Sequence, residues 1–84
     1  MPTAFVLITC EKGSENQIIE YLSEVQEIRE IKPTVGHFDL VAKITSPTQG
    51  RLSQIIIEKI RKDNKIRSTE VLLRLETVEP VEVR

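Results

Sequence analysis

Hydrophobic and polar positions change their spacing several times along the chain, and each change predicts a new element. The continuous apolar run AFVLITC at 4–10 is typical of a strand covered on both faces, which belongs in the middle of a sheet. After Gly13 the apolar residues recur at helical spacing, which predicts a helix that ends near Gln26. Ser14 and Gln17 form an S-x-x-Q capping box and place the start of this helix at Ser14.

A β-hairpin is predicted next, from two alternating runs on either side of a glycine. In EIREIKPTV at 27–35, apolar residues alternate with polar ones, and Pro33 confines this strand to a sheet edge or a bulge. Gly36 offers the positive φ angle that a tight connection needs. The run FDLVAKIT at 38–45 alternates again. Its apolar face consists of Phe38, Leu40, Ala42 and Ile44.

A second helix is predicted from the same kind of N-terminal capping residues as the first. Ser46 is the expected N-cap, Pro47 the first helical residue and Gln49 the end of a second capping box. The apolar stripe consists of Leu52, Ile55, Ile56 and Ile60. The cations at 61–65 complement the negative end of the helix dipole, and Asn64 is expected to close the helix in a left-handed conformation.

The last elements complete a repeated strand-helix-strand pattern. IRSTEVLLRLET at 66–77 predicts a long final strand, and VEPVEVR at 78–84 predicts an edge segment interrupted by Pro80. The order is βαββαβ, which indicates an α+β protein of the ferredoxin-like class. Right-handed crossovers place two helices on one face of a four-stranded antiparallel sheet, with the first and third strands in the middle.

The sheet face away from the helices is expected to be apolar over several strands. Its apolar residues are Phe5, Leu7, Val41 and Leu72. A patch of this extent is unfavourable in water. The simplest cover is a second copy of the chain around a two-fold axis, so we predict a homodimer that forms through the two sheets.

Size and charge narrow the function classes. The chain has 84 residues, of which 39% are hydrophobic and 30% charged, so residues 1–84 are expected to form a single globular domain. A domain of this size is marginally stable alone, which favours association. Its 12 Lys and Arg against 13 Asp and Glu give a net charge of -1 with both signs interspersed, which argues against direct DNA binding.

The sequence offers no sign of a membrane, a disulfide or a metal. It holds no signal peptide and no apolar stretch of membrane-spanning length, so the expected location is the cytoplasm. Cys10 is the one cysteine and His37 the one histidine, which excludes an internal disulfide and leaves no set of metal ligands. No cofactor is expected.

The hairpin sequence TVGHFDL at 34–40 allows three interpretations: an active site, a ligand-binding loop or a plain turn. His37 alone in a turn is typical of an exposed side chain without a catalytic role. Asp39 fits either an acceptor for an ammonium group or a turn-side carboxylate that accepts backbone N–H groups. In the alternative function, a small ferredoxin-like dimeric enzyme of the oxygenase or isomerase type, His37 and Asp39 act as acid and base if both lie on one strand face. Three aromatic residues leave little to line a hydrophobic substrate pocket for such an enzyme.

Two motifs resemble a known family. The βαββαβ order, G-x-F-D-L at 36–40 and I-x-x-T-x-V-L-L at 66–73 resemble the effector domain of the Lrp/AsnC transcription regulators, often called the RAM domain. The resemblance implies a non-enzymatic domain that binds a small effector, typically an amino acid. It also implies a dimer with back-to-back sheets that assembles further, commonly into an octamer, with the effector at the seam between dimers. The residues so implied are Thr34, Val35, Gly36, His37, Phe38 and Asp39 in the hairpin, and Ser68, Thr69 and Glu70 at the start of the last strand.

Two features depart from the family pattern. Family members carry an N-terminal helix-turn-helix, whereas this chain starts with its first strand at Met1, which predicts a stand-alone effector domain. Any effect on transcription would then be indirect, through a partner such as a full-length Lrp/AsnC regulator. Val71 takes the place of the second threonine in the family's V-x-x-T-x-T motif, which predicts either a preference for a ligand with an apolar side chain or a lost response to the commonest effectors.

Overall fold

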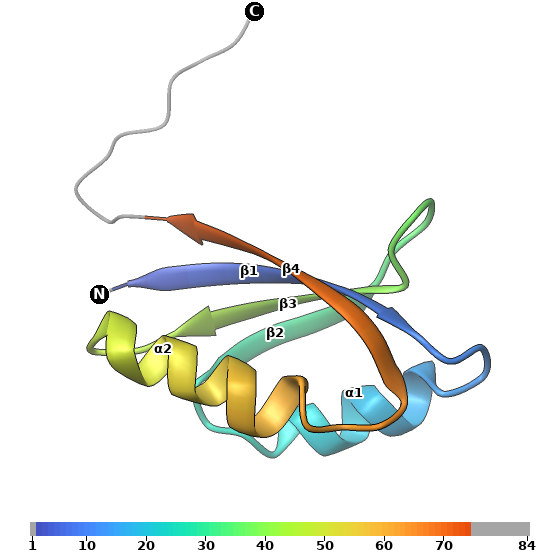
Figure 1. Ribbon diagram of the computed structural model, residues 1–84, viewed down its shortest axis with the longest axis horizontal. Helices are drawn as coiled ribbons and strands as arrows, with labels where there is room; N and C mark the ends of the chain where they lie inside the picture. Colours follow the sequence, from blue (N-terminus) through green and yellow to red (C-terminus); the bar gives the residue numbers. More distant parts are fainter. Residues whose placement is uncertain (1, 75–84) are drawn as a thin grey trace, which may run out of the picture.

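The computed structural model describes residues 2–74, which form a four-stranded antiparallel sheet with both helices on one face (Figure 1). The strand order β2-β3-β1-β4 makes the first and third strands central and the other two the edges, as predicted. The α+β, ferredoxin-like class is therefore confirmed. The elements are β1 (Thr3–Cys10), α1 (Glu15–Ser23), β2 (Ile28–Pro33), β3 (Leu40–Thr45), α2 (Gln49–Ile55), the π-helical η1 (Ile56–Ile60) and β4 (Ile66–Arg74). The predicted continuation of the last strand to residue 77 and the segment 78–84 lie outside the described residues.

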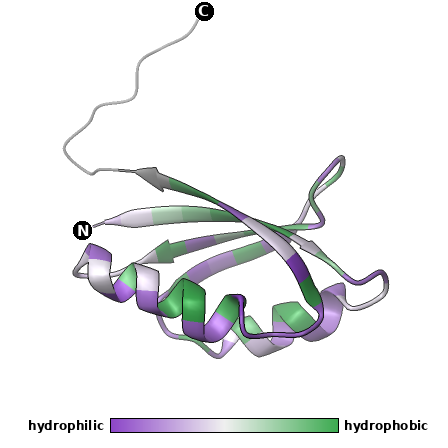
Figure 2. Cartoon of the chain, in the orientation of Figure 1, coloured by the Kyte–Doolittle hydropathy of each residue, from purple (hydrophilic) through white to green (hydrophobic). Residues whose placement is uncertain are grey.

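The core lies between the sheet and the helices and follows from the alternation of the two central strands (Figure 2). The strand residues buried in it are Ala4, Val6, Ile8, Cys10, Leu40, Ala42 and Ile44. The helical residues buried in it are Ile18, Leu22, Leu52, Ile55, Ile56 and Ile60, which confirms the predicted stripe of the second helix. The first helix also buries one face, but it ends at Ser23 instead of near Gln26. A fully enclosed side chain such as Ile44 contributes about 1.5–3 kcal/mol, so this alternation fixes which sheet face meets the helices.

The helix starts differ from the capping boxes that the sequence predicts. Ser14 precedes α1, but its side chain makes no capping bond, because the residue has helical angles (φ -95°, ψ -1°) instead of extended ones. The N-cap of α2 is Thr48 rather than Ser46. Thr48 is extended (φ -136°, ψ 155°), and its Oγ1 accepts a hydrogen bond from Arg51 N at 3.1 Å. The hydroxyl of Ser46 is buried and accepts from Thr48 N instead.

Two further expectations at element boundaries are wrong and one is confirmed. The third strand begins at Leu40 rather than Phe38, because the chain still bends through the hairpin up to that point. Asn64 does not close its helix in a left-handed conformation, since no described residue other than glycine has a positive φ. Gly36 has the expected positive φ, 106°.

The sheet face opposite the helices is open in the described part of the chain (Figure 1). Phe5, Leu7 and Val41 are half-buried on this face, and Leu72 is 52% exposed. The register brings them together, since Phe5 pairs with Leu72 and Leu7 pairs with Val41. The predicted apolar patch therefore exists in the single chain.

Candidate functional site

The hairpin between β2 and β3 is closed at its base and exposed at its tip. Thr34 donates from its backbone N–H to Asp39 O at 2.9 Å and from its hydroxyl to Phe38 O at 2.5 Å. At the tip, Gly36 has its positive φ, and Val35 is 99% exposed. The tip can therefore contact another molecule without a change in the base.

Asp39 ties this hairpin to the end of β1. Its Oδ2 accepts the backbone N–H of Cys10 at 2.8 Å, and its own N–H donates to Ile8 O at 2.8 Å. The carboxylate thus takes the place of a backbone carbonyl just before the first residue of β3. Of the two carboxylate oxygens, Oδ2 accepts the Cys10 N–H, which agrees with the interpretation of Asp39 as a turn-side carboxylate. Burial, and then the charge of Asp39, raise the pKa of the Cys10 thiol, so Cys10 serves as a small core residue.

His37 and Asp39 do not form the acid–base pair that the enzyme alternative requires. That pair depends on strand geometry at His37, but the strand begins only at Leu40. His37 lies exposed in the bend, while the Asp39 carboxylate is bound to the Cys10 amide.

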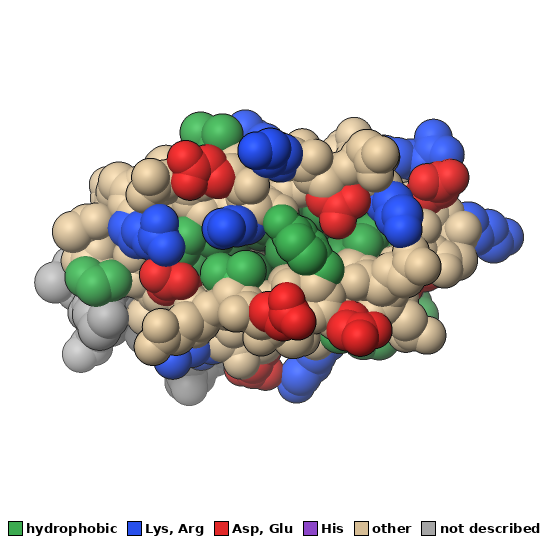
Figure 3. All heavy atoms as spheres, turned by 90° about the horizontal axis from the view of Figure 1, so that it is seen from below, with side chains coloured by type: hydrophobic (Ala, Val, Ile, Leu, Met, Phe, Trp, Pro, Cys, Tyr) green, Lys and Arg blue, Asp and Glu red, His purple; other side chains and the backbone are tan. Residues whose placement is uncertain are grey.

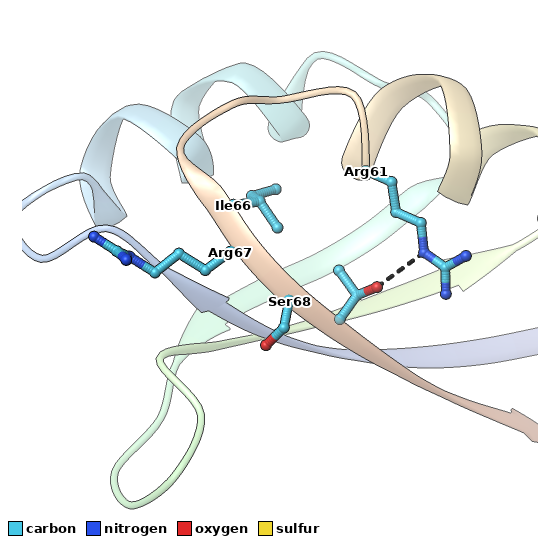
Figure 4. A pocket seen from close by; sticks show the side chains of 5 residues that line it. Arg61, Ile66, Arg67 and Ser68 are labelled. Carbon is cyan, nitrogen blue, oxygen red and sulfur yellow. Dashed lines mark hydrogen bonds between the residues drawn. The ribbon is translucent and has the colours of Figure 1, made fainter.

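A hollow of about 360 Å³ lies beside the start of β4 (Figure 4). We call it the β4 hollow; its lining residues are Arg61, Ile66, Arg67, Ser68 and Thr69. Arg61 reaches from the end of η1 toward β4, and its Nε donates to Thr69 Oγ1 at 3.0 Å. Arg67 leaves β4 in the other direction, so the two guanidinium groups do not converge (Figure 4).

The π-helical turn positions Arg61. Arg61 N donates to Ile56 O at 2.8 Å, a bond that spans five residues instead of the four of an α-helix. Arg61 and Arg67 were not predicted as site residues, because the cations at 61–65 were attributed to the helix dipole and Arg67 was taken only as part of the last strand. Strand alternation could not have placed Arg67, because the pairing of β4 with β1 shifts register between Thr9 and Cys10, which pair with Ser68 and Ile66.

The structure places the two predicted sets of site residues at the same end of the sheet but does not bring them together. Leu40, which follows the hairpin, and Thr69 both pair with Ile8 of β1. Two strand spacings, about 10 Å, therefore separate β3 from β4 at this level. Ser68 and Thr69 line the β4 hollow, whereas Glu70 pairs with Leu7 and lies exposed on the open sheet face.

A model of the Lrp/AsnC ligand binding domain matches residues 3–82. The chain belongs to this family. The Lrp/AsnC domain is a regulatory, ligand-binding domain without catalytic activity, so the enzyme alternative is wrong.

Two curated relatives of this Lrp/AsnC domain are uncharacterised HTH-type transcriptional regulators of Pyrococcus abyssi. One is 25% identical over 79 residues, which cover 90% of this chain and 53% of the relative. The other is 31% identical over 67 residues, which cover 80% of this chain and 42% of the relative. The chain therefore spans about half the length of these relatives.

Solved structures share the fold of the Lrp/AsnC domain. The crystal structure of FFRP-DM1 has a TM-score of 0.86 and 35% identity, over 89% of this chain and 100% of that chain. A transcriptional regulator of Neisseria meningitidis in complex with L-Met has a TM-score of 0.78 at 10% identity, over 94% of this chain and 53% of that chain. The second likeness concerns the fold alone.

The surface of the Lrp/AsnC domain mixes charges of both signs. Figure 3 shows the helical face, on which cationic and anionic side chains are interspersed around a small hydrophobic area. Within residues 2–74, no helix is long and apolar enough to cross a membrane. The same residues contain no group of three His, Cys, Asp or Glu side chains that could hold a metal ion.

Proposed function

We propose that residues 1–84 act as one effector-binding and oligomerisation domain, whose effector is an amino acid. The domain regulates transcription indirectly in the cytoplasm, through a DNA-binding partner such as a full-length Lrp/AsnC regulator, and does not bind DNA itself. Family membership supports the effector-binding role. The solved complex of the Neisseria meningitidis regulator with L-Met supports an amino acid as the class of ligand.

The fixed guanidinium of Arg61 is the observation that carries this proposal. Its Nε bond to Thr69 holds the planar group in one orientation at the edge of the β4 hollow. A guanidinium held in this way is suited to a carboxylate, which it can bind through two parallel hydrogen bonds. The Ser68 hydroxyl adds a donor, and Ile66 supplies an apolar wall.

The ammonium group of an amino acid needs an acceptor from outside the β4 hollow, because none of the residues that line the hollow is acidic. Glu70 is one source, and Asp39 is another through the oxygen that does not bind Cys10. Since β1 separates the hairpin from the hollow within one chain, we propose that residues 34–39 of a neighbouring copy close the site. The effector would then lie at a seam between copies.

Such a seam requires assembly. The open sheet face, with Phe5, Leu7, Val41 and Leu72, supports a homodimer through the sheets, and we propose that the dimers assemble further into an octamer. Light scattering at micromolar concentration should give about eight chains. A particle of two chains would contradict the seam.

Titration calorimetry of the ligand-free chain against the twenty amino acids tests the proposal. Arg61→Gln should weaken the binding of the responding amino acid about tenfold to a hundredfold, since it removes a charge-assisted contact. Lys62→Gln is the matched control, because Lys62 is an exposed cation that does not line the hollow. Equal affinity for wild type and Arg61→Gln would place the effector elsewhere, and no response to any amino acid would favour a pure assembly module.

A filter-binding assay with an operator fragment tests the indirect route. The purified 84-residue chain should not retain the fragment, because its charges are nearly balanced and interspersed. Salt-sensitive retention by the chain alone would contradict indirect regulation.

A further inference from the structure

A second depression, which we call the Ile57 groove, runs between the helical layer and β4. It has a volume of about 160 Å³, and its lining residues are Leu52, Ser53, Ile56, Ile57, Arg61 and Val71. Ile57 is 58% exposed and adds apolar surface to the groove. Arg61 is the one residue that this groove shares with the β4 hollow, so a charge stands at one end of a floor that is apolar except for Ser53.

The groove runs along an open sheet edge. β4 is nine residues long, pairs with β1 on one side and has no strand on the other within the described part of the chain. The opposite edge is protected, since β2 ends in Pro33 and its register shifts between Ile28 and Glu30. β4 has no proline between Ile66 and Arg74. An unprotected edge beside an apolar floor is suited to an added strand.

We propose that residues 75–84 of a second copy bind along the β4 edge and over the Ile57 groove. This segment alternates so that Glu79, Val81 and Val83 share one face in an extended conformation. The two valines match the apolar floor, and the glutamate matches Arg61 at its end. Ten extended residues span about 33 Å, enough to follow the whole of β4. Pro80 then closes the new edge against further strands.

The same segment is poorly suited to fold back onto its own β4. An antiparallel return directly after Arg74 needs turn-forming residues, and LETV at 75–78 contains no Gly, Pro, Asn or Asp. The first such residue is Pro80, which leaves only residues 81–84 to return along the strand. A second copy is therefore the occupant, and this contact shares Arg61 with the effector site proposed above.

Charge exchange in the full chain tests this inference without any added amino acid. Arg61→Glu and Glu79→Lys each place like charges at the contact, and each variant alone should associate about tenfold more weakly in sedimentation velocity at low salt. Mixing the two variants should restore association, because the altered groove then meets the altered segment of the other chain. Lys12→Glu and Glu82→Lys are the controls, with the same charge changes at an exposed turn and on the other face of the segment.

The mixture separates this proposal from its alternatives. If association recovers only when both substitutions are in one chain, the segment binds its own β4. That result would overturn the exchange between copies. Unchanged association for all variants would overturn the contact altogether. A loss with Arg61→Glu that neither arrangement restores would assign Arg61 to another interface and would also overturn it.

Discussion

Replacing Asp39 with alanine should loosen the end of β1. The Cys10 residue is 6% exposed, and its N–H has the Asp39 carboxylate as acceptor at 2.8 Å. Without that acceptor a buried donor loses a charged partner, which costs about 1.5–3 kcal/mol of the free energy of unfolding. For a domain of this size, each kcal/mol changes the melting temperature by roughly 4–8 °C, so we expect a decrease of about 6–24 °C.

Urea denaturation followed by circular dichroism measures this loss. The protein concentration must be held constant, because assembly would add to the apparent stability. Asp39→Asn is the matched control, since its amide oxygen still accepts from Cys10 N and should recover a large part of the stability. Amide exchange at Cys10 gives a local readout and should accelerate in Asp39→Ala. An unfolding free energy within about 0.5 kcal/mol of wild type, with unchanged exchange at Cys10, would refute this reasoning.

Three further predictions address the dimer face, the helix caps and the loss of stability at low pH. Leu7→Asp should weaken association at least about a hundredfold, because each copy loses the burial of a leucine side chain, which contributes about 1.5–3 kcal/mol to the free energy of association. An unchanged sedimentation coefficient would contradict a sheet-to-sheet dimer. Thr48→Ala should cost about 1 kcal/mol in urea denaturation, whereas Ser14→Ala should cost less than about 0.5 kcal/mol, and equal losses would contradict the assignment of the caps. A hydrogen bond from its own backbone N–H and then the Arg51 guanidinium at 3.1 Å lower the pKa of Glu27 below 4.5. Its contribution to stability is therefore present above pH 4.5 and is lost as the pH falls through the lower folded-state value, so Glu27→Gln should flatten the decrease between pH 5 and pH 3. A decrease of the same steepness in wild type and variant would refute the role of Glu27.

The element order could be predicted because it depends on local periodicity. Strand alternation and helical stripes reflect one buried face each, and the same residues are buried in the structure. The helix starts could not be predicted, because a capping box is a pattern of residue types, whereas a cap depends on backbone angles. Ser14 and Thr48 show the difference: the first has helical angles and the second extended ones. Gln17, the predicted partner of Ser14, accepts instead from Lys65 Nζ, which is distant in sequence.

The candidate site was predicted less completely than the fold. Ser68 and Thr69 could be named from their position at the start of the last strand, and they do line a hollow. Arg61 could not, because its bond to Thr69 joins a helix end to a strand and depends on the tertiary arrangement. The role of Asp39 remained open between ligand contact and turn, because one carboxylate in a hairpin serves either purpose. Its bond to the Cys10 amide depends on how the ends of β1 and β3 meet.

The π-helical turn η1 makes the position of Arg61 tolerant of a one-residue change in chain length. Deleting one residue from Ile56–Ile60 would convert the five-residue bond to Ile56 O into the four-residue bond of an α-helix. Because the same carbonyl would then accept from the same arginine N–H, that side chain would keep nearly its present direction from the helix axis. In a regular α-helix the loss of one residue would instead rotate every later side chain by about 100°. The helix can therefore gain or lose one residue at this turn and keep its arginine at the hollow.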